Sequence, residues 1–189
     1  MNETRIFGFG GSLRKDSFNW ALLEAAVKLT PTNARLEVFS RNDLEQVPLF
    51  NQDMEHNPPD VVRIFKNMAK KSDSILISTP EYNFSFPGLL KNLIDWASRP
   101  DEDNVFNGKP VAIMSASTGI FGGIRAQFQL RQTLLALNMH PLNRPIVAIG
   151  NAATKIDENG CIRDEKTKKR IEELLKALIE WTKRLKANG

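Results

Sequence analysis

Short apolar runs alternate with helical patterns along the chain, and this alternation constrains the fold more than any other feature. The runs are rich in Ile, Val and Phe, and several are apolar at consecutive positions, as in strands buried between two helix layers. The expected strands cover residues 4–10, 35–40, 74–79, 109–117 and 144–150. Helical patterns follow them at residues 17–30, 60–71, 88–98, 123–138 and 166–186.

This order of elements predicts an α/β fold with a doubly wound parallel sheet. A connection between parallel neighbouring strands is right-handed and places its helix on one face of the sheet. Five strand–helix units predict a five-stranded parallel sheet in the order 2-1-3-4-5, with helices on both faces. Because the chain of 189 residues contains no repeat or linker, we expect one domain over residues 1–189.

Composition excludes a membrane-spanning or disulfide-rich protein. The chain is 41% hydrophobic and 25% charged, which is typical of a globular protein. No apolar run reaches the roughly 18 residues of a membrane span, and the first residues do not form a secretory signal. Cys161 is the single cysteine, so no internal disulfide can form. We therefore expect a cytoplasmic protein without membrane partners.

The net charge of +4 and the pI of about 9.3 raise the question of nucleic-acid binding. From residue 163 onward, nine Lys and Arg residues outnumber five Asp and Glu residues, and the rest of the chain carries 17 of each sign. The excess falls on the last helical pattern, where acidic and basic residues are mixed. We interpret it as a solvated helix face and expect no nucleic-acid partner, with a nucleic-acid patch as the alternative.

The first segment of functional interest is the glycine-rich turn GFGGSLRKDSFN, residues 8–19. In a doubly wound sheet, ligands bind beyond the carboxyl ends of the strands, near the point where the strand order reverses. A dinucleotide fingerprint requires a third glycine where Leu13 stands. A P-loop requires Ser or Thr after its lysine, where Asp16 stands. The turn therefore matches neither of these phosphate loops.

The turn instead offers hydroxyls and a cation that can surround a terminal phosphate monoester. Ser17 is a candidate N-cap for the following helix, whose first N–H groups are then free to face an anion. Hydroxyl donors and a guanidinium group suit the charged oxygens of a single phosphate. A serine-rich turn that only caps the helix is the alternative. The predicted anion-binding residues are Ser12, Arg14, Ser17 and Asn19.

Two further segments follow the third and fourth expected strands. PEYNFSFP, residues 80–87, is a short aromatic loop between prolines that restrict its backbone, so its main chain can face the polar edge of a flat ligand. STGIFGG, residues 117–123, contains three glycines that permit close approach of a ligand to the backbone. The alternatives are aromatic packing in the core or at a subunit contact, and a tight turn without a ligand.

Residue types for metal or acid–base catalysis are sparse. His56 and His140 are the only histidines, and neither lies near Cys or acidic residues at metal-ligand spacing. There is no G-x-S-x-G motif of a hydrolase. We therefore predict no metal site and no catalytic side chain, and we expect a cofactor that supplies the chemistry itself.

Three motifs, GSLRKDSFN, PEYNFSFPGLLKNLIDWASRP and SASTGIFGGIRAQ, occur in the order found in a known family. Through them the chain resembles, over essentially its whole length, the NADPH-dependent FMN reductases, a flavodoxin-like group that includes quinone, chromate and azo-dye reductases. The resemblance implies a flavodoxin-like fold and non-covalent FMN. It implies that the FMN phosphate contacts Ser12, Leu13, Arg14, Ser17 and Asn19, and that the ring contacts Pro80, Glu81, Tyr82, Asn83, Ser117, Gly119, Gly122 and Gly123.

The same resemblance implies a ping-pong oxidoreductase. NADPH or NADH reduces FMN and leaves, and a quinone, chromate, azo compound or similar acceptor then takes the electrons. It also implies a homodimer or homotetramer, with Trp96 and its neighbours as candidate interface residues. Phe84 occupies a position that is often histidine in the family, and this departure bears on substrate choice.

An electron-transfer flavoprotein that does not oxidise NAD(P)H directly is the alternative function. Such carriers share the expected fold but are typically acidic. The balanced charge of this chain and its basic last helix argue against that class.

Overall fold

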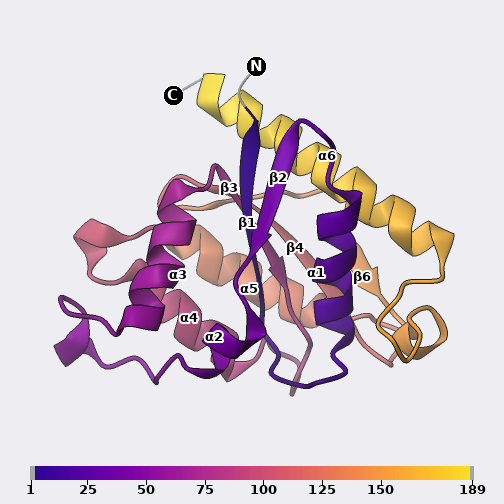
Figure 1. Cartoon of the computed structure of the whole chain (residues 1–189), viewed down its shortest axis with the longest axis horizontal. Coiled ribbons are helices and arrows are strands. Elements are labelled where there is room, and N and C mark those ends of the chain that lie inside the picture. Colours follow the sequence, from indigo (N-terminus) through magenta and orange to yellow (C-terminus); the bar gives the residue numbers. More distant parts are fainter. Residues whose placement is uncertain (1–2, 188–189) are drawn as a thin grey trace.

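The computed structural model describes residues 3–187, and within them the sheet has six strands, all paired in parallel (Figure 1). The order β2-β1-β3-β4-β5 confirms the predicted topology, and β6 also pairs with β4. The sheet register places Gly10 beside Ser78 and Ser78 beside Met114. The strands are β1 (Thr4–Gly10), β2 (Ala34–Val38), β3 (Ser74–Ser78), β4 (Pro110–Ala116), β5 (His140–Pro141) and β6 (Val147–Ile149).

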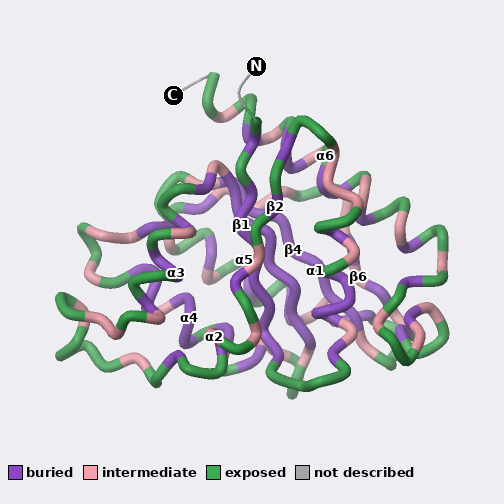
Figure 2. The backbone as a smooth tube through the Cα atoms, in the orientation of Figure 1, coloured by how far each residue is buried: buried purple, intermediate pink, exposed green. Residues whose placement is uncertain are grey.

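Helices cover both faces of this sheet. α1 and α6 pack against each other and against β4 on one face, whereas α3, α4 and α5 cover the other (Figure 1). The buried strands form the centre of the molecule (Figure 2). The helices are α1 (Phe18–Leu29), α2 (Arg41–Glu45), α3 (Asp60–Lys71), α4 (Gly88–Ser98), α5 (Ile124–Ala136) and α6 (Glu165–Ala187).

The fifth strand position differs from the prediction. Instead of one strand over residues 144–150, the short strands β5 and β6 lie one after the other along β4. Pro141 and Pro145 lack the N–H donor that a continuous ladder needs, so pairing is interrupted between them. The helix α2 was not predicted. It begins after Ser40, whose hydroxyl accepts a hydrogen bond from the Asp43 N–H at 3.0 Å.

Trp96 belongs to the core, so the expectation that it lies at a subunit interface is wrong. Its side chain is 1% exposed, and its indole Nε1 donates a hydrogen bond to the Pro48 carbonyl at 2.9 Å. The ring of Phe50 packs edge-on against it, with the ring centroids 5.0 Å apart. The apolar face of α4 therefore packs against the segment that precedes α3.

The turn between β4 and α5 is packed directly against the main chain at the end of β6. Gly122 and Gly123 have φ angles of +61° and +83°. A Cβ atom on Gly122 would lie 2.6 Å from the carbonyl carbon of Ala148 and from the Ile149 nitrogen. The Ser115 hydroxyl also donates a hydrogen bond to the Gly122 carbonyl at 2.6 Å. The turn therefore requires glycine at residue 122 because of its own packing and backbone conformation.

We predict that Gly122→Ala lowers the free energy of unfolding by about 2 kcal/mol or more, since it adds a backbone clash to a left-handed conformation. Urea unfolding of the FMN-free protein, followed by far-UV circular dichroism, measures this change. Gly119→Ala is the matched control, because the nearest atom to its Cβ would be the Ser117 Oγ at 3.8 Å. Equal unfolding free energies for the two variants would contradict the role given to Gly122.

Candidate functional site

Three loops meet at the carboxyl edge of the sheet, because β1, β3 and β4 are parallel neighbours. They are the loops after β1 (residues 11–17), after β3 (79–87) and after β4 (117–123). Main-chain hydrogen bonds continue the ladder into the first two loops, from Gly11 to the Ser78 carbonyl and from Thr79 to the Met114 carbonyl, each at 3.0 Å. The three segments singled out in the sequence therefore lie together.

Asn19 ties the start of α1 to the ends of β3 and β4. It is 3% exposed, and its Oδ1 accepts hydrogen bonds from the Ala116 N–H at 2.9 Å and from the Ser78 hydroxyl at 3.3 Å. Its Nδ2 donates to the Ala116 carbonyl at 3.0 Å. The side-chain amide is thus engaged within the chain. Its main-chain N–H belongs to the first helical turn and is the group that Asn19 can offer an anion.

The loop after β1 leaves helix N–H groups without acceptors. Ser17 occupies the N-cap position of α1 with extended backbone angles, but its side chain makes no capping hydrogen bond. Within residues 3–187, the N–H groups of Phe18 and Asn19 have no protein acceptor. Such N–H groups at a helix start bind anions. Ser12 shapes the loop, since its Oγ accepts from the Arg14 N–H at 3.2 Å and its carbonyl accepts from the Trp20 Nε1 at 2.6 Å.

Basic side chains surround this loop. The Arg14 guanidinium donates to the Asp16 carbonyl and lies 5.1 Å from the centroid of the Phe18 ring. Arg41, from the start of α2, donates its Nη1 to the Lys15 carbonyl at 2.7 Å. Arg14, Lys15 and Arg41 also line a cavity of about 890 Å³. Sequence reasoning missed Arg41, since nothing in its local pattern indicated that it reaches a loop 26 residues earlier.

Leu13 is 44% exposed beside the candidate phosphate-binding residues.

The loop after β3 begins with the buried Pro80, and its tip at residues 82–84 is exposed. The main chain of Tyr82 and Ser85 exchanges two hydrogen bonds of 2.9 Å, which closes a tight turn over Asn83 and Phe84. Within the described part of the chain, the N–H groups of Glu81 and Asn83 have no acceptor. The turn therefore keeps free main-chain donors, as the predicted ring contact requires.

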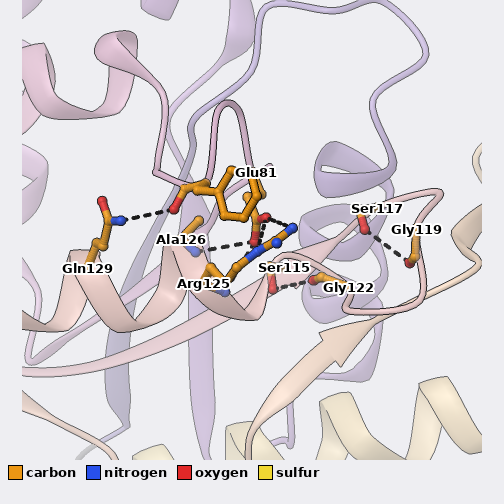
Figure 3. A network of polar contacts seen from close by, with 9 residues as sticks. Glu81, Ser115, Ser117, Gly119, Gly122, Arg125, Ala126 and Gln129 are labelled. Atoms are coloured by element: carbon orange, nitrogen blue, oxygen red, sulfur yellow. Dashed lines mark hydrogen bonds and ion pairs between the residues drawn. The ribbon is translucent and has the colours of Figure 1, made fainter.

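The Glu81 side chain points toward α5, where the sequence predicted no partner (Figure 3). Its Oε1 accepts from the Arg125 Nε at 2.6 Å, and its Oε2 accepts from the Arg125 N–H at 3.1 Å. Arg125 is the second functional candidate that sequence reasoning missed. A local sequence motif cannot show this ion pair, because Glu81 and Arg125 lie 44 residues apart in the sequence.

In the loop after β4, the predicted residues divide into two kinds. Ser117 and Gly119 are accessible, and the Ser117 hydroxyl donates to the Gly119 carbonyl at 3.2 Å (Figure 3). Gly122 and Gly123 are buried against the chain itself. They shape the turn, while Ser117 and Gly119 present accessible groups at its surface.

These groups fit a ligand with one terminal phosphate and a flat polar ring. Unpaired helix N–H groups and Arg14 suit the phosphate, and the free N–H groups of the 79–87 loop suit polar atoms at a ring edge. No group of three His, Cys, Asp or Glu residues within residues 3–187 could hold a metal ion. No helix in that range is both long enough and apolar enough to cross a membrane.

Known proteins resemble the chain over nearly its whole length. It is 44% identical over 187 residues to an NAD(P)H-dependent FMN reductase of Pseudomonas aeruginosa, covering 98% of each chain. It is 42% identical over 185 residues to an NADPH:quinone oxidoreductase of Arabidopsis thaliana, covering 96% of this chain and 93% of that protein.

A solved structure has the same fold. It is the flavoenzyme NAD(P)H:(acceptor) oxidoreductase FerB of Paracoccus denitrificans, which superposes with a TM-score of 0.86 at 33% identity, covering 96% of this chain and 98% of that one. The family described as NADPH-dependent FMN reductase matches residues 4–154, which include all three loops of the site. These matches confirm the family, the FMN cofactor and the oxidoreductase class that the three sequence motifs imply. The chain belongs to the NADPH-dependent FMN reductase family.

Proposed function

We propose that this protein is an NAD(P)H:quinone oxidoreductase that works through bound FMN by a ping-pong sequence. The proposal rests on one observation: unpaired N–H groups at the start of α1 and free main-chain N–H groups in the loop after β3 lie at the same edge of the sheet. The relatives named as FMN and quinone reductases support the same conclusion. Chromate and azo compounds are further acceptors in this proposal.

We assign the two ends of FMN to different loops. The phosphate would be held at the start of α1, and the isoalloxazine ring would lie against the loops after β3 and β4. Asn19 would contribute its main-chain N–H, and Gly122 and Gly123 would contribute the shape of the turn. The proposed set is Ser12, Leu13, Arg14, Ser17, Asn19, Pro80, Glu81, Tyr82, Asn83, Ser117, Gly119, Gly122 and Gly123.

FMN, when bound, accepts a hydride from NAD(P)H and passes the electrons on to an acceptor. The side chains of this protein would bind and orient the reactants. Tyr82 and Phe84 are 52% and 63% exposed at the candidate ring site, so they can pack against a flat nicotinamide or quinone. No side chain is assigned as an acid or a base, in keeping with a cofactor that performs the redox step.

The whole chain forms one FMN-binding reductase domain in this proposal, and it acts in the cytoplasm. The helix α6, which follows the matched family segment, packs on α1 and β4 and so completes the cover of the sheet. An electron carrier of the same fold is the second candidate function, and the experiment below separates it from a reductase.

Anaerobic stopped-flow mixing of the FMN-loaded protein with NADPH tests the proposal. We expect the flavin absorbance to bleach without any added redox partner, and to recover when a benzoquinone is added. An electron carrier would bleach only in the presence of a separate reductase. A flavin that stays oxidised with both NADPH and NADH would therefore contradict the proposed function.

Arg14→Ala is predicted to weaken FMN binding about 10- to 100-fold, because it removes a charge-assisted hydrogen bond to the phosphate. Fluorescence quenching on titration of the FMN-free protein with FMN and with riboflavin measures the effect. Riboflavin lacks the phosphate, so its affinity should stay unchanged. Arg35→Ala, at the exposed amino end of β2, is the control and should change neither affinity. Equal losses for FMN and riboflavin in Arg14→Ala would contradict the assignment.

We also propose that the protein is a homo-oligomer that associates through the outer face of α5. Phe128 and Leu135, which lie seven residues apart on one face of α5, are 55% and 62% exposed. Phe121, in the loop before the helix, is 59% exposed. The other exposed residues of α5 carry no charge; they are Gln129, Gln132 and Ala136. The partly exposed Arg125 guanidinium packs on the Phe121 ring beside this face. Exposed apolar side chains with an arginine among them are typical of a protein interface.

Phe128→Glu is predicted to lower the molecular mass measured by sedimentation equilibrium, because it places a charge beside Leu135 on the apolar face of α5. Ile64→Glu, on the exposed face of α3, is the control and should leave the mass unchanged. A monomeric mass for the unmodified protein would refute the oligomer.

A further inference from the structure

One ion pair joins the loop after β3 to the first turn of α5, beside the candidate ring site (Figure 3). Glu81 lies in the loop after β3, and Arg125 is the second residue of α5, directly after the loop from β4. The Glu81 side chain is only 8% exposed. Its carboxylate is bound by the Arg125 Nε at 2.6 Å, by Arg125 Nη2, and by the N–H groups of Arg125 and Ala126 at 3.1 and 3.4 Å. The buried charge is therefore paired and hydrogen-bonded, as its burial requires.

The same guanidinium group also joins the two loops by aromatic contacts. Its Cζ lies 3.9 Å from the ring centroid of Phe84, in the first loop, and 5.2 Å from that of Phe121, in the second. A planar guanidinium packs well on aromatic faces, which a lysine ammonium cannot reproduce. Arg125 thus has an ionic and an aromatic contact to the loop after β3, and an aromatic contact to the loop after β4.

Phe84 is held in a backbone conformation that phenylalanine rarely adopts. Its φ angle is +66°, in the left-handed region. The surrounding contacts keep it there: Gln129 Nε2 donates to the Phe84 carbonyl at 3.0 Å, and Tyr82 and Ser85 close the turn. Such residues persist where neighbouring contacts over-determine the geometry, and they concentrate at ligand sites.

From these contacts we propose that Arg125 is a positioning residue for the ring end of the FMN site. It fixes the spacing of the 79–87 and 117–123 loops and thereby sets the affinity for the isoalloxazine ring. It acts through Glu81 and Phe84, and makes no contact with the phosphate. The inference rests on the proposed FMN site and adds that the two ends of the ligand are recognised independently, with Arg14 at the phosphate and Arg125 behind the ring.

A role of Arg125 in folding alone makes a different prediction, and α5 provides a matched control. Arg131 lies on the same helix and is partly buried, and its Nη2 donates to the Leu142 carbonyl at 2.8 Å, away from both loops. Arg131→Gln therefore removes an arginine contact of α5 without touching the loop spacing. A residue that only stabilises the fold changes the free energy of unfolding and leaves flavin affinity unchanged.

The experiment measures dissociation constants for FMN and for riboflavin on the FMN-free protein, by quenching of flavin fluorescence, together with urea unfolding. Arg125→Gln is expected to weaken both ligands by the same factor, about 10-fold or more, because misplaced loops lose contact with the ring that both ligands share. Arg125→Lys keeps the charge but loses the planar guanidinium that packs on Phe84, so its loss of flavin affinity should be intermediate. Arg131→Gln should change neither affinity.

Glu81→Gln and the double variant Glu81→Gln/Arg125→Gln complete the design. If Arg125 acts through Glu81, the double variant should bind flavin no more weakly than Arg125→Gln, so the two losses are not additive. If Arg125→Gln does not fold, Arg125→Lys and Glu81→Gln still test whether the ion pair sets flavin affinity. Wild-type affinity for both ligands in Arg125→Gln, or in Arg125→Lys and Glu81→Gln, would overturn the inference. A loss confined to FMN would also overturn it, since that would place Arg125 at the phosphate.

The outcome is separable from the proposed function. If the unmodified protein bound neither FMN nor riboflavin, the FMN site itself would be wrong. If it bound both and Arg125→Gln bound them equally well, only the positioning role of Arg125 would be wrong.

Discussion

The geometry of the site depends on one buried amide. Asn19 joins the first turn of α1 to the main chain of Ala116 at the end of β4 and to the Ser78 hydroxyl at the end of β3. A buried amide with these bonds satisfied is costly to displace, because any movement leaves polar atoms without partners. The start of α1, with its unpaired N–H groups, and the two strand ends that lead into the 79–87 and 117–123 loops are therefore held in fixed positions relative to one another.

The two halves of the site differ in the interactions that they offer a ligand. At the start of α1, N–H groups without protein acceptors and the nearby Arg14 create a site for localised negative charge. At the other loops, the charge of Glu81 is already compensated by Arg125, and what remains accessible is main chain and aromatic surface. A ligand with a charged phosphate at one end and a flat, polar-edged ring at the other matches this division. Such a ligand would also account for the missing third glycine of a dinucleotide loop in the turn after β1, because a terminal phosphate does not require the close backbone approach that a diphosphate does.

Sequence patterns predicted the sheet order, the five long helices and the three loops, because apolar periodicity and turn residues are local signals. The same patterns predict a single fifth strand over residues 144–150. In the structure, Pro141 and Pro145 interrupt the pairing with β4, so two short strands take its place. What the sequence could not show were contacts between distant segments. The sequence does not show that the Asn19 side chain binds residues 59 and 97 positions away, which leaves its main-chain N–H for the proposed ligand contact. The contacts of Arg125 and Arg41 could not be predicted for the same reason. Gly122 needs its small size because it packs against the main chain at the end of β6.

The central claim is that one ligand spans the three loops, with its phosphate at the start of α1. A crystal structure of the protein with FMN tests this claim most directly. We expect the phosphate within hydrogen-bonding distance of the Phe18 and Asn19 N–H groups, and the ring beside the main chain of Glu81 and Asn83. FMN bound elsewhere, or bound with its ring at the start of α1, would contradict it.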